Sequence, residues 1–274
     1  MDFTIKTYEH LLTALKESGY IFQTFAEFIE SPAEKAIVLR HDVDAKKWNS
    51  YRFAKIQAGM EIKGTYYFRM ISKSFSKRVI REIATMGHEI GYHYETMNTS
   101  GGDVDEAYVE FCRKLEIFRK LVPIKTICMH GSPLSKYDNR SIWQKYNYKD
   151  LGIIGEPYFD IDFNKVLYLT DTGRRWNGDK VSFRDKVSDN FRHVGSDQAY
   201  DIRNQKLTQN SKLKTQNLTF RSTKDIITAA EAGTLPDQMM FTFHPQRWTD
   251  KPFPWLKELV WQNIKNQVKR ILVK

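Results

Sequence analysis

Residues 36–44 read Ala-Ile-Val-Leu-Arg-His-Asp-Val-Asp, and this segment sets the architecture that we predict for the chain. Its apolar start, 36–39, is a short continuous run typical of a strand buried on both faces. A helical pattern follows at 47–58, where Tyr51 and Ala54 lie on one face. A buried strand followed by a helix predicts a βα unit, which builds parallel sheets covered by helices.

The same alternation continues along the chain. Further strands are predicted at 64–70, 88–93, 126–129, 151–154, 166–169 and 239–243. Helices are predicted at 76–86, from Asp103 to about Pro123, from Ser222 to Gly233 and at 255–272. About seven such units favour an α/β fold, an irregular (β/α) barrel of about seven parallel strands, over an open sheet.

Two parts of the chain differ from this pattern. Residues 1–34 predict a helical segment that packs on the barrel, because apolar residues recur at helical spacing there, at Leu11, Leu12, Leu15, Phe22, Phe25 and Ile29. Residues 35–274 predict a single barrel domain. Within it, the polar stretch 193–218 is rich in Gln, Asn and Lys and is expected to be an exposed insertion.

Composition narrows the class of protein. Of the 274 residues, 41% are hydrophobic, so the chain can bury a sizeable core. No run approaches the roughly 18 apolar residues of a membrane span, and residues 1–16 lack the apolar region of a signal peptide, so we expect a cytoplasmic protein. Only two cysteines occur, Cys112 and Cys128, which excludes a disulfide scaffold and predicts two reduced core thiols.

The formal net charge of +10 favours acidic partners: nucleic acid, an anionic lipid surface or anionic glycans. The alternative is that the excess lysine only keeps the chain soluble. Because no nucleic-acid-binding motif accompanies the charge, we expect no nucleic-acid partner.

Reactive side chains follow the ends of four predicted strands. These segments are His41-Asp42-Val43-Asp44, His93-Tyr94-Glu95, His130-Gly131-Ser132-Pro133 and His244-Pro245. The carboxyl ends of parallel strands carry the catalytic loops of βα barrels. Four of the seven histidines are therefore expected on one rim.

Asp42 and Asp44 are two residues apart, so in an extended segment both carboxylates face one side. Close carboxylates repel each other unless a cation lies between them or one takes a proton. This pair therefore predicts a divalent metal together with a general base. The alternative is that one of the two caps the following helix.

The histidines extend this interpretation. His93 and Glu95 also share one side of their strand, and a neutral imidazole is a good zinc ligand. His244 stands before a proline that stiffens the turn, in a good position for a general acid. His88 lies at the start of its strand and is expected to be structural.

Six further residues follow predicted strands and are candidates for substrate binding: Arg69, Tyr94, Glu156, Asp171, Arg174 and Trp176. A backbone N–H near Tyr94 would help to hold an oxyanion. Trp176 would stack on a sugar ring, although a core tryptophan fits the pattern equally well.

Three segments, 37–44, 87–93 and 240–245, resemble the motifs of the polysaccharide deacetylase family. This family is also called carbohydrate esterase family 4 or the NodB-homology group, and it belongs to a glycoside hydrolase/deacetylase superfamily. The resemblance covers roughly 35–248 in the same motif order. Its most specific part is Gly-His-Glu-Ile-Gly-Tyr-His at 87–93. The His-Asp-Val-Asp form resembles a divergent branch linked to bacterial surface polysaccharides.

The resemblance implies roles for individual residues. Asp42 aligns with the family's general base, His93 with its first metal histidine and His244 with its general acid. The chain departs from the pattern at Met97, which stands in place of the second metal histidine. Asp44, one residue beyond the usual metal aspartate, is then a ligand only in a rearranged loop. Glu95 or His130 would complete a site for a divalent metal, zinc by preference.

The activity implied is that of a metal-dependent hydrolase that removes an N-acetyl group from a sugar in surface polysaccharide biosynthesis. The expected substrate is an N-acetylated glycan, with the positive charge suggesting an anionic, nucleotide-linked or lipid-linked one. Two alternatives stay open: a catalytically impaired carbohydrate-binding scaffold of the same fold, and a barrel hydrolase acting on another C–N bond.

Overall fold

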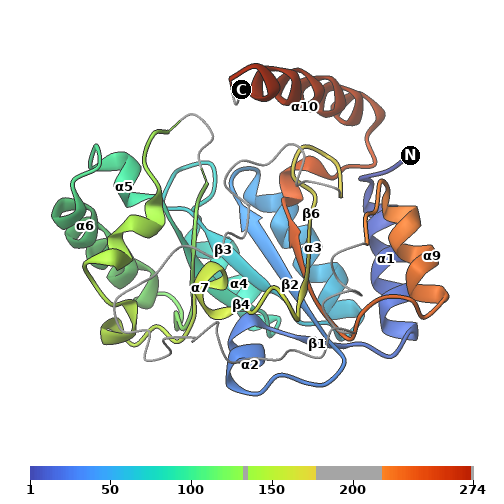
Figure 1. Ribbon diagram of the computed structural model, residues 1–274, viewed down its shortest axis with the longest axis horizontal. Helices are drawn as coiled ribbons and strands as arrows, with labels where there is room; N and C mark the ends of the chain where they lie inside the picture. The colour runs from blue at the N-terminus through green and yellow to red at the C-terminus, as the bar shows by residue number, and fades with distance from the viewer. Residues whose placement is uncertain (132–134, 177–217, 273–274) are drawn as a thin grey trace, which may run out of the picture.

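The computed structural model describes residues 1–131, 135–176 and 218–272. Figure 1 shows its ribbon. The strands are β1 (Ile21–Gln23), β2 (Ala36–Val43), β3 (Thr65–Phe68), β4 (Glu89–Tyr94), β5 (Ile127–Met129), β6 (Leu167–Thr170) and β7 (Gln238–Phe243). The helices are α1 (Ile5–Glu17), α2 (Phe25–Glu30), α3 (Lys47–Gly59), α4 (Lys77–Thr85), α5 (Thr96–Thr99), α6 (Val104–Arg119), α7 (Pro157–Asp160), α9 (Thr223–Glu231) and α10 (Pro252–Leu272), with short 3-10 turns η1 (Asn139–Gln144), η2 (Tyr148–Leu151) and η4 (Pro245–Arg247).

The sheet is a curled half-barrel of parallel strands. Six strands follow the order β5-β4-β3-β2-β7-β6, and β1 pairs with β2 beside this path. All pairings between the described strands are parallel. The predicted α/β class and parallel sheet are therefore confirmed, but the described strands do not close into a barrel. β6 and β5 lie at the two ends of the path, and β5 is extended only by a single bridge between Thr126 and Gly155.

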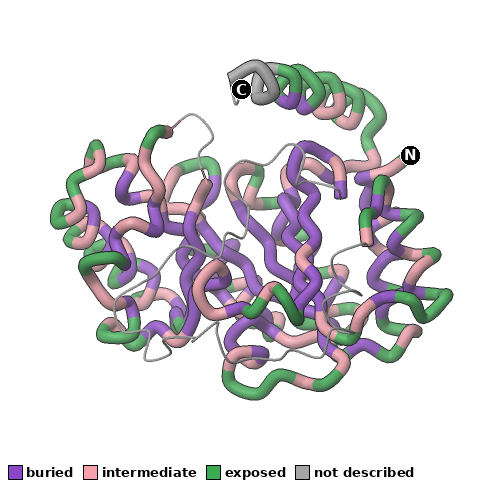
Figure 2. The backbone as a smooth tube through the Cα atoms, viewed as in Figure 1, coloured by how far each residue is buried: buried purple, intermediate pink, exposed green. Residues whose placement is uncertain are grey.

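Both faces of β2 are covered, and all eight of its residues are buried (Figure 2). Because side chains alternate along a strand, Ile37 and Leu39 join the larger core under the helices. Ala36 and Val38 join a second, smaller core on the concave side. The apolar run that predicted this strand therefore serves two cores at once.

β4 packs closely against the smaller core on the concave side. Gly91 lies against the ring of Tyr67, where a Cβ atom would come within 2.3 Å of the ring carbons. Only glycine allows this approach of backbone to ring. The Tyr67 hydroxyl contacts that of Thr126 at 3.0 Å, so it fills the interior below His93.

Most predicted elements are confirmed, and Asp103 caps α6 as expected, since its carboxylate accepts from the N–H groups of residues 105 and 106. Two predictions were wrong. Phe22 belongs to the short strand β1 rather than to a helix. Residues 151–154 form no strand, because η2 ends at Leu151 and only the bridge at Gly155 reaches the sheet. The predicted insertion at 193–218 lies, except for Leu218, outside the described residues.

Candidate metal and active site

Asp42 is a deeply buried acidic side chain of the site. It lies at the carboxyl end of β2, 4% exposed, on the concave face. Arg40, two residues earlier on the same face, donates from Nε and Nη2 to the two carboxylate oxygens at 2.8 and 2.7 Å. Burial raises the pKa of Asp42, but the charges of Arg40 and His93 outweigh it and hold this pKa far below its ordinary value. Asp42 is therefore ionised.

Asp44 follows β2 in a tight turn, in which its N–H donates to the Asp42 carbonyl at 3.0 Å. It does not cap α3, because the N-cap residue of that helix is Lys46 and no side chain caps it. Oδ2 of Asp44 accepts from Gln246 at 3.2 Å. Oδ1 is buried and has no hydrogen-bond partner. A buried carboxylate oxygen without a donor is costly unless a ligand satisfies it.

His93 is held in one tautomer. Its Nδ1 lies 2.9 Å from the Cys128 carbonyl, an acceptor, so Nδ1 carries the proton. Nε2 is left with a lone pair and faces Asp42 Oδ2 at 3.6 Å and Asp44 Oδ1 at 3.7 Å. Burial, offset only in part by Asp42, lowers the pKa of His93 to about 4. A neutral imidazole with a fixed tautomer is the state that a metal ion requires.

His130 completes the group. Its Nε2 lies 3.5 Å from Asp44 Oδ1. On the other side of the ring, Glu95 Oε2 lies 3.1 Å from Nδ1 at a contact distance, without the alignment of a hydrogen bond. Arg69 donates to both oxygens of Glu95, at 3.2 and 2.5 Å. Burial raises the pKa of Glu95, but His130 and Arg69 lower it to about 2.

Asp44, His93 and His130 each offer one ligand atom, and these atoms all lie within 4.8 Å of one another. Tetrahedral ligands about 2.0–2.1 Å from zinc lie about 3.3 Å apart, close to the 3.5 and 3.7 Å found here. The unpartnered Oδ1 of Asp44 points at this gap. These three residues, predicted as ligands, therefore fit a divalent ion. Glu95, also predicted, instead contacts the far side of His130.

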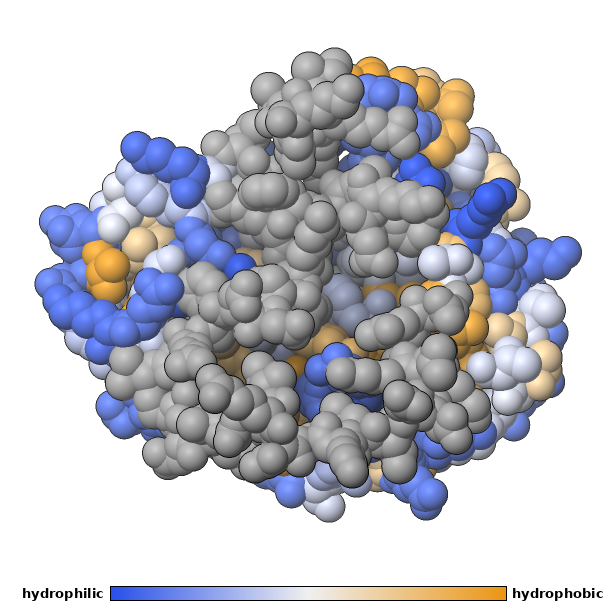
Figure 3. Space-filling model, in the orientation of Figure 1, coloured by the Kyte–Doolittle hydropathy of each residue, from blue (hydrophilic) through white to orange (hydrophobic). Residues whose placement is uncertain are grey.

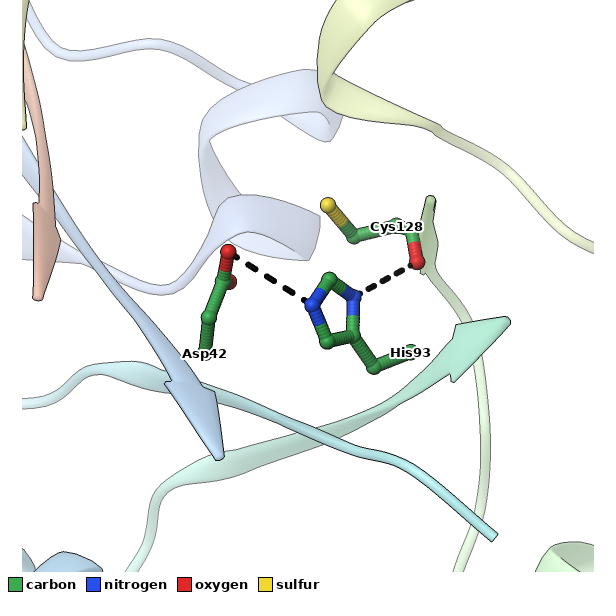
Figure 4. A group of neighbouring side chains, drawn as sticks. All are labelled: Asp42, His93 and Cys128. Atoms are coloured by element: carbon green, nitrogen blue, oxygen red, sulfur yellow. Dashed lines mark hydrogen bonds and ion pairs between the residues drawn. The ribbon is translucent and has the colours of Figure 1, made fainter. Parts of the chain in front are cut away.

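A second group also has ligand atoms that all lie within 4.8 Å of one another; it consists of Asp42, His93 and Cys128 (Figure 4). Figure 4 shows Asp42 and His93 facing each other, with the Cys128 carbonyl behind the ring. Both oxygens of Asp42 already accept from Arg40, whose positive charge also disfavours a cation there. The first group is therefore the better candidate, with Asp42 beside it.

His244 comes from the neighbouring strand end and is paired with a buried carboxylate. Asp171 accepts from Nδ1 of His244 at 2.6 Å and from its backbone N–H at 2.9 Å. Trp248 and Arg247 also donate to Asp171, at 2.6 and 3.1 Å. Nε2 of His244 then faces Asp44 Oδ2 at 3.8 Å. Burial and Arg247 oppose protonation, but Asp171 and Asp44 outweigh them, so the pKa of His244 is raised.

Asp171 was predicted to bind substrate, and the structure gives it a different position. It is fully buried, and its backbone N–H donates to the Thr242 carbonyl at 3.1 Å. Tyr94 and Glu156 are likewise fully buried. The Tyr94 hydroxyl accepts from Trp143 at 2.8 Å, and Glu156 caps α7 by accepting from the N–H of residue 158. None of the three has a surface to offer a substrate.

Arg174 and Trp176 are also structural. Arg174 donates to the carbonyls of Trp255 and Asp2, at 2.9 and 3.4 Å. Trp176 is 2% exposed, and its indole donates to Thr223 at 2.8 Å, so it is a core tryptophan rather than a sugar platform. Of the six candidates for substrate binding, Arg69 alone keeps a partly exposed side chain, 18% exposed and already paired with Glu95.

His41 does not join the rim. Its side chain points to the helix side of β2, where Nδ1 donates to the Thr65 carbonyl at 3.1 Å and the ring stacks on Tyr66. Three of the four rim histidines therefore come together. His88 is structural, as predicted: its Nε2 donates to the Ala54 carbonyl at 2.9 Å.

Arg40 is one site residue that sequence reasoning missed. The rule that paired Asp42 with Asp44 applies equally to Arg40 and Asp42, since they too are two residues apart on one strand. Gln246 and Arg247 were also missed, because turn residues give no periodic pattern.

The fold and the site together define an α/β protein whose curled parallel sheet carries a carboxylate–histidine group able to hold a metal ion. Comparisons with family models, with curated proteins and with solved structures found no significant match for this chain.

Proposed function

We propose that this protein is a metal-dependent hydrolase that removes an N-acetyl group from a sugar. The observation that carries the proposal is the juxtaposition of three elements within one rim: the Asp44, His93 and His130 donors, an ionised Asp42, and a His244–Asp171 pair with a raised histidine pKa. Amide hydrolysis needs a Lewis acid, a base for water and an acid for the leaving nitrogen.

The roles follow from the charge states. A divalent ion held by the three donors would supply polarisation of the acetyl carbonyl. Asp42 takes up a proton as the water oxygen bonds to the acetyl carbon. His244, protonated because Asp171 lies 2.6 Å from Nδ1, gives its Nε2 proton to the sugar nitrogen as the C–N bond breaks. The products are acetate and the free amino sugar.

Asp171 acts through His244 and is a positioning residue. Its second oxygen accepts from the backbone N–H of His244, so one carboxylate fixes both the ring and the main chain of this residue. Arg40 acts in the same way on Asp42, because its two bonds keep the carboxylate ionised and fix its plane.

The substrate class is an N-acetylated glycan that carries negative charge, such as a nucleotide-linked or lipid-linked sugar of bacterial surface polysaccharide synthesis. The excess of ten positive charges in the chain supports an anionic substrate.

The direct test is acetate release by zinc-loaded protein from N-acetylglucosamine oligomers and from nucleotide-linked N-acetylglucosamine. Asp42→Asn and His244→Ala are each expected to lose at least about 100-fold in rate, since general acid–base groups contribute about that much. The control is His10→Ala, at an exposed position of α1. Zinc and glycan binding without acetate release would contradict the proposal and favour a carbohydrate-binding scaffold.

A further inference from the structure

The C-terminal helix α10 presents its apolar side to solvent. Large apolar residues recur along its 21 residues at spacings of three and four, which places them on one face. They are exposed to between 49% and 78%: Phe253, Leu256, Val260, Trp261 and Ile264. Figure 3 shows hydrophobic residues gathered along the upper edge of the molecule, where α10 lies in Figure 1.

The opposite side of α10 faces the body and is partly polar. Gln262 and Asn266 are 8% and 7% exposed, and Asn266 donates to the Gly173 carbonyl at 3.2 Å. Trp255, near the start of the helix, donates from its indole to the Asp2 carbonyl at 2.7 Å. A surface helix of a globular domain normally buries its apolar stripe, and here five large residues of such a stripe are exposed. The apolar face is therefore available to contact a partner that lies outside the described residues.

The charge of the C-terminal segment distinguishes between possible partners of the apolar face of α10. Residues 251–274 contain six basic residues and one acidic residue, Glu258; the basic ones are Lys251, Lys257, Lys265, Lys269, Arg270 and Lys274. Two copies of so basic a segment would repel each other if their helices packed face to face. An anionic lipid surface complements the charge, and its acyl boundary accepts the apolar face, with Phe253 and Trp261 at the depth that aromatic residues favour.

We propose that α10 lies in the plane of an anionic phospholipid membrane, with its Phe253–Ile264 face inserted at the boundary between headgroups and acyl chains. No helix among the described residues is long and apolar enough to cross a bilayer, α10 included. The attachment is thus interfacial and depends on both apolar area and charge.

The docked helix would also orient the candidate site. Asn266 bonds the loop that follows β6, and Asp171 lies two residues before Gly173 in that loop. Membrane attachment would therefore bring the rim close to the lipid surface. The docking proposal itself stands without the proposed function, because it rests on residues of α10 alone.

The test is sedimentation of the purified full chain with vesicles of phosphatidylcholine alone or with about one third phosphatidylglycerol. Binding to the anionic vesicles is expected to be at least about 10-fold tighter, and to weaken strongly between low salt and about 0.5 M salt. Val260→Gln with Ile264→Gln should reduce it by about 10-fold or more, since glutamine keeps the helix and removes the apolar face. The matched control is Val109→Gln with Ile117→Gln, two exposed apolar residues of α6.

Three results would overturn the proposal. The wild-type chain would fail to bind either vesicle, or the control pair would lose binding as much as the α10 pair. The third is a concentration-dependent dimer, seen by analytical ultracentrifugation and abolished by the α10 pair, without vesicle binding; this would assign the face to a second copy of the chain. Because no substrate or metal is used, failure of the deacetylase proposal leaves this test unaffected.

Discussion

Glu95 Oε2 lies 3.1 Å from Nδ1 of His130, while Nε2 on the other side of the ring faces Asp44 Oδ1 at 3.5 Å. Glu95 is itself held by two bonds from Arg69. The sequence pattern alone suggested that Glu95 binds the metal directly. In the structure it supports a ligand instead, which is a common role for a carboxylate behind a metal-binding histidine.

Replacement of Glu95 by Gln should weaken zinc binding by about 10- to 100-fold, the usual effect of removing such a supporting carboxylate. His130→Ala should weaken it more, because a ligand is lost. Isothermal titration of metal-free protein with zinc measures both. The control is Glu110→Gln on α6, away from the site. If Glu95→Gln were as damaging as Asp44→Ala, Glu95 would be a ligand rather than a support.

The Asp171–His244 pair predicts coupled effects on catalysis. Asp171→Asn removes the charge that favours the imidazolium, so the acid form of His244 is lost at a lower pH than in the wild type. We expect a rate loss of about 100-fold or more and a basic limb of the pH–rate profile that moves to lower pH. The double change with His244→Ala should cost little more than His244→Ala alone. If steady-state kinetics showed that the rate losses of the two single variants multiply in the double variant, Asp171 would act independently of His244.

Much of this site could be predicted because the ends of buried strands can be recognised from their apolar runs in the sequence. The apolar run before Asp42 gave the strand, and the rule of alternation gave the side to which Asp42 points. The same rule, applied strictly, would have placed His41 and Tyr94 on the helix side and Arg40 beside Asp42. The sides to which His41, Tyr94 and Arg40 point therefore follow from the alternation of side chains along their strands.

Other features depend on tertiary contacts that no local pattern encodes. Asp171 is placed under His244 by the register of β6 on β7, in which Thr170 pairs with Thr242. His130 approaches Asp44 only because the sheet curls, since their strands are separated by two others. The half-barrel shape itself depends on how the end strands β5 and β6 are partnered, and single-strand patterns carry no information on that.

The Arg40–Asp42 pair predicts a large effect on stability. Arg40→Met would leave a buried carboxylate without its partner, which typically costs about 3–5 kcal/mol in the free energy of unfolding. Adding Asp42→Asn should recover most of this loss, because the unpaired charge is then gone. Urea denaturation at neutral pH measures both. The control is Arg52→Met, which breaks an ion pair with Asp250 in which the arginine side chain is about half exposed. This change should lower the free energy of unfolding by about 1 kcal/mol or less. Equal losses in the single and double variants would contradict the argument.

His41 predicts how stability depends on pH. Its Nδ1 donates to the Thr65 carbonyl, and Nε2 accepts from Tyr8 or Gln57, at 3.2 and 3.0 Å. A second proton, on Nε2, would turn this acceptor into a donor that faces the donor groups of Tyr8 and Gln57 in a buried site. Burial accordingly lowers the pKa of His41 to about 3 from its ordinary value of 6.5. Between these two values the unfolded chain binds the extra proton and the folded chain does not, so stability falls as the pH is lowered.

For His41 alone, the expected loss between pH 6.5 and pH 4.5 is roughly 2 kcal/mol in the free energy of unfolding. His41→Gln should lower stability at pH 7, because hydrogen bonds are lost, yet flatten this part of the pH dependence. His10→Gln, at an exposed position, should leave the slope unchanged. Urea denaturation curves at half-unit pH steps measure the slope. A slope as steep in His41→Gln as in the wild type would mean that other groups, such as the buried His93, account for the acid sensitivity.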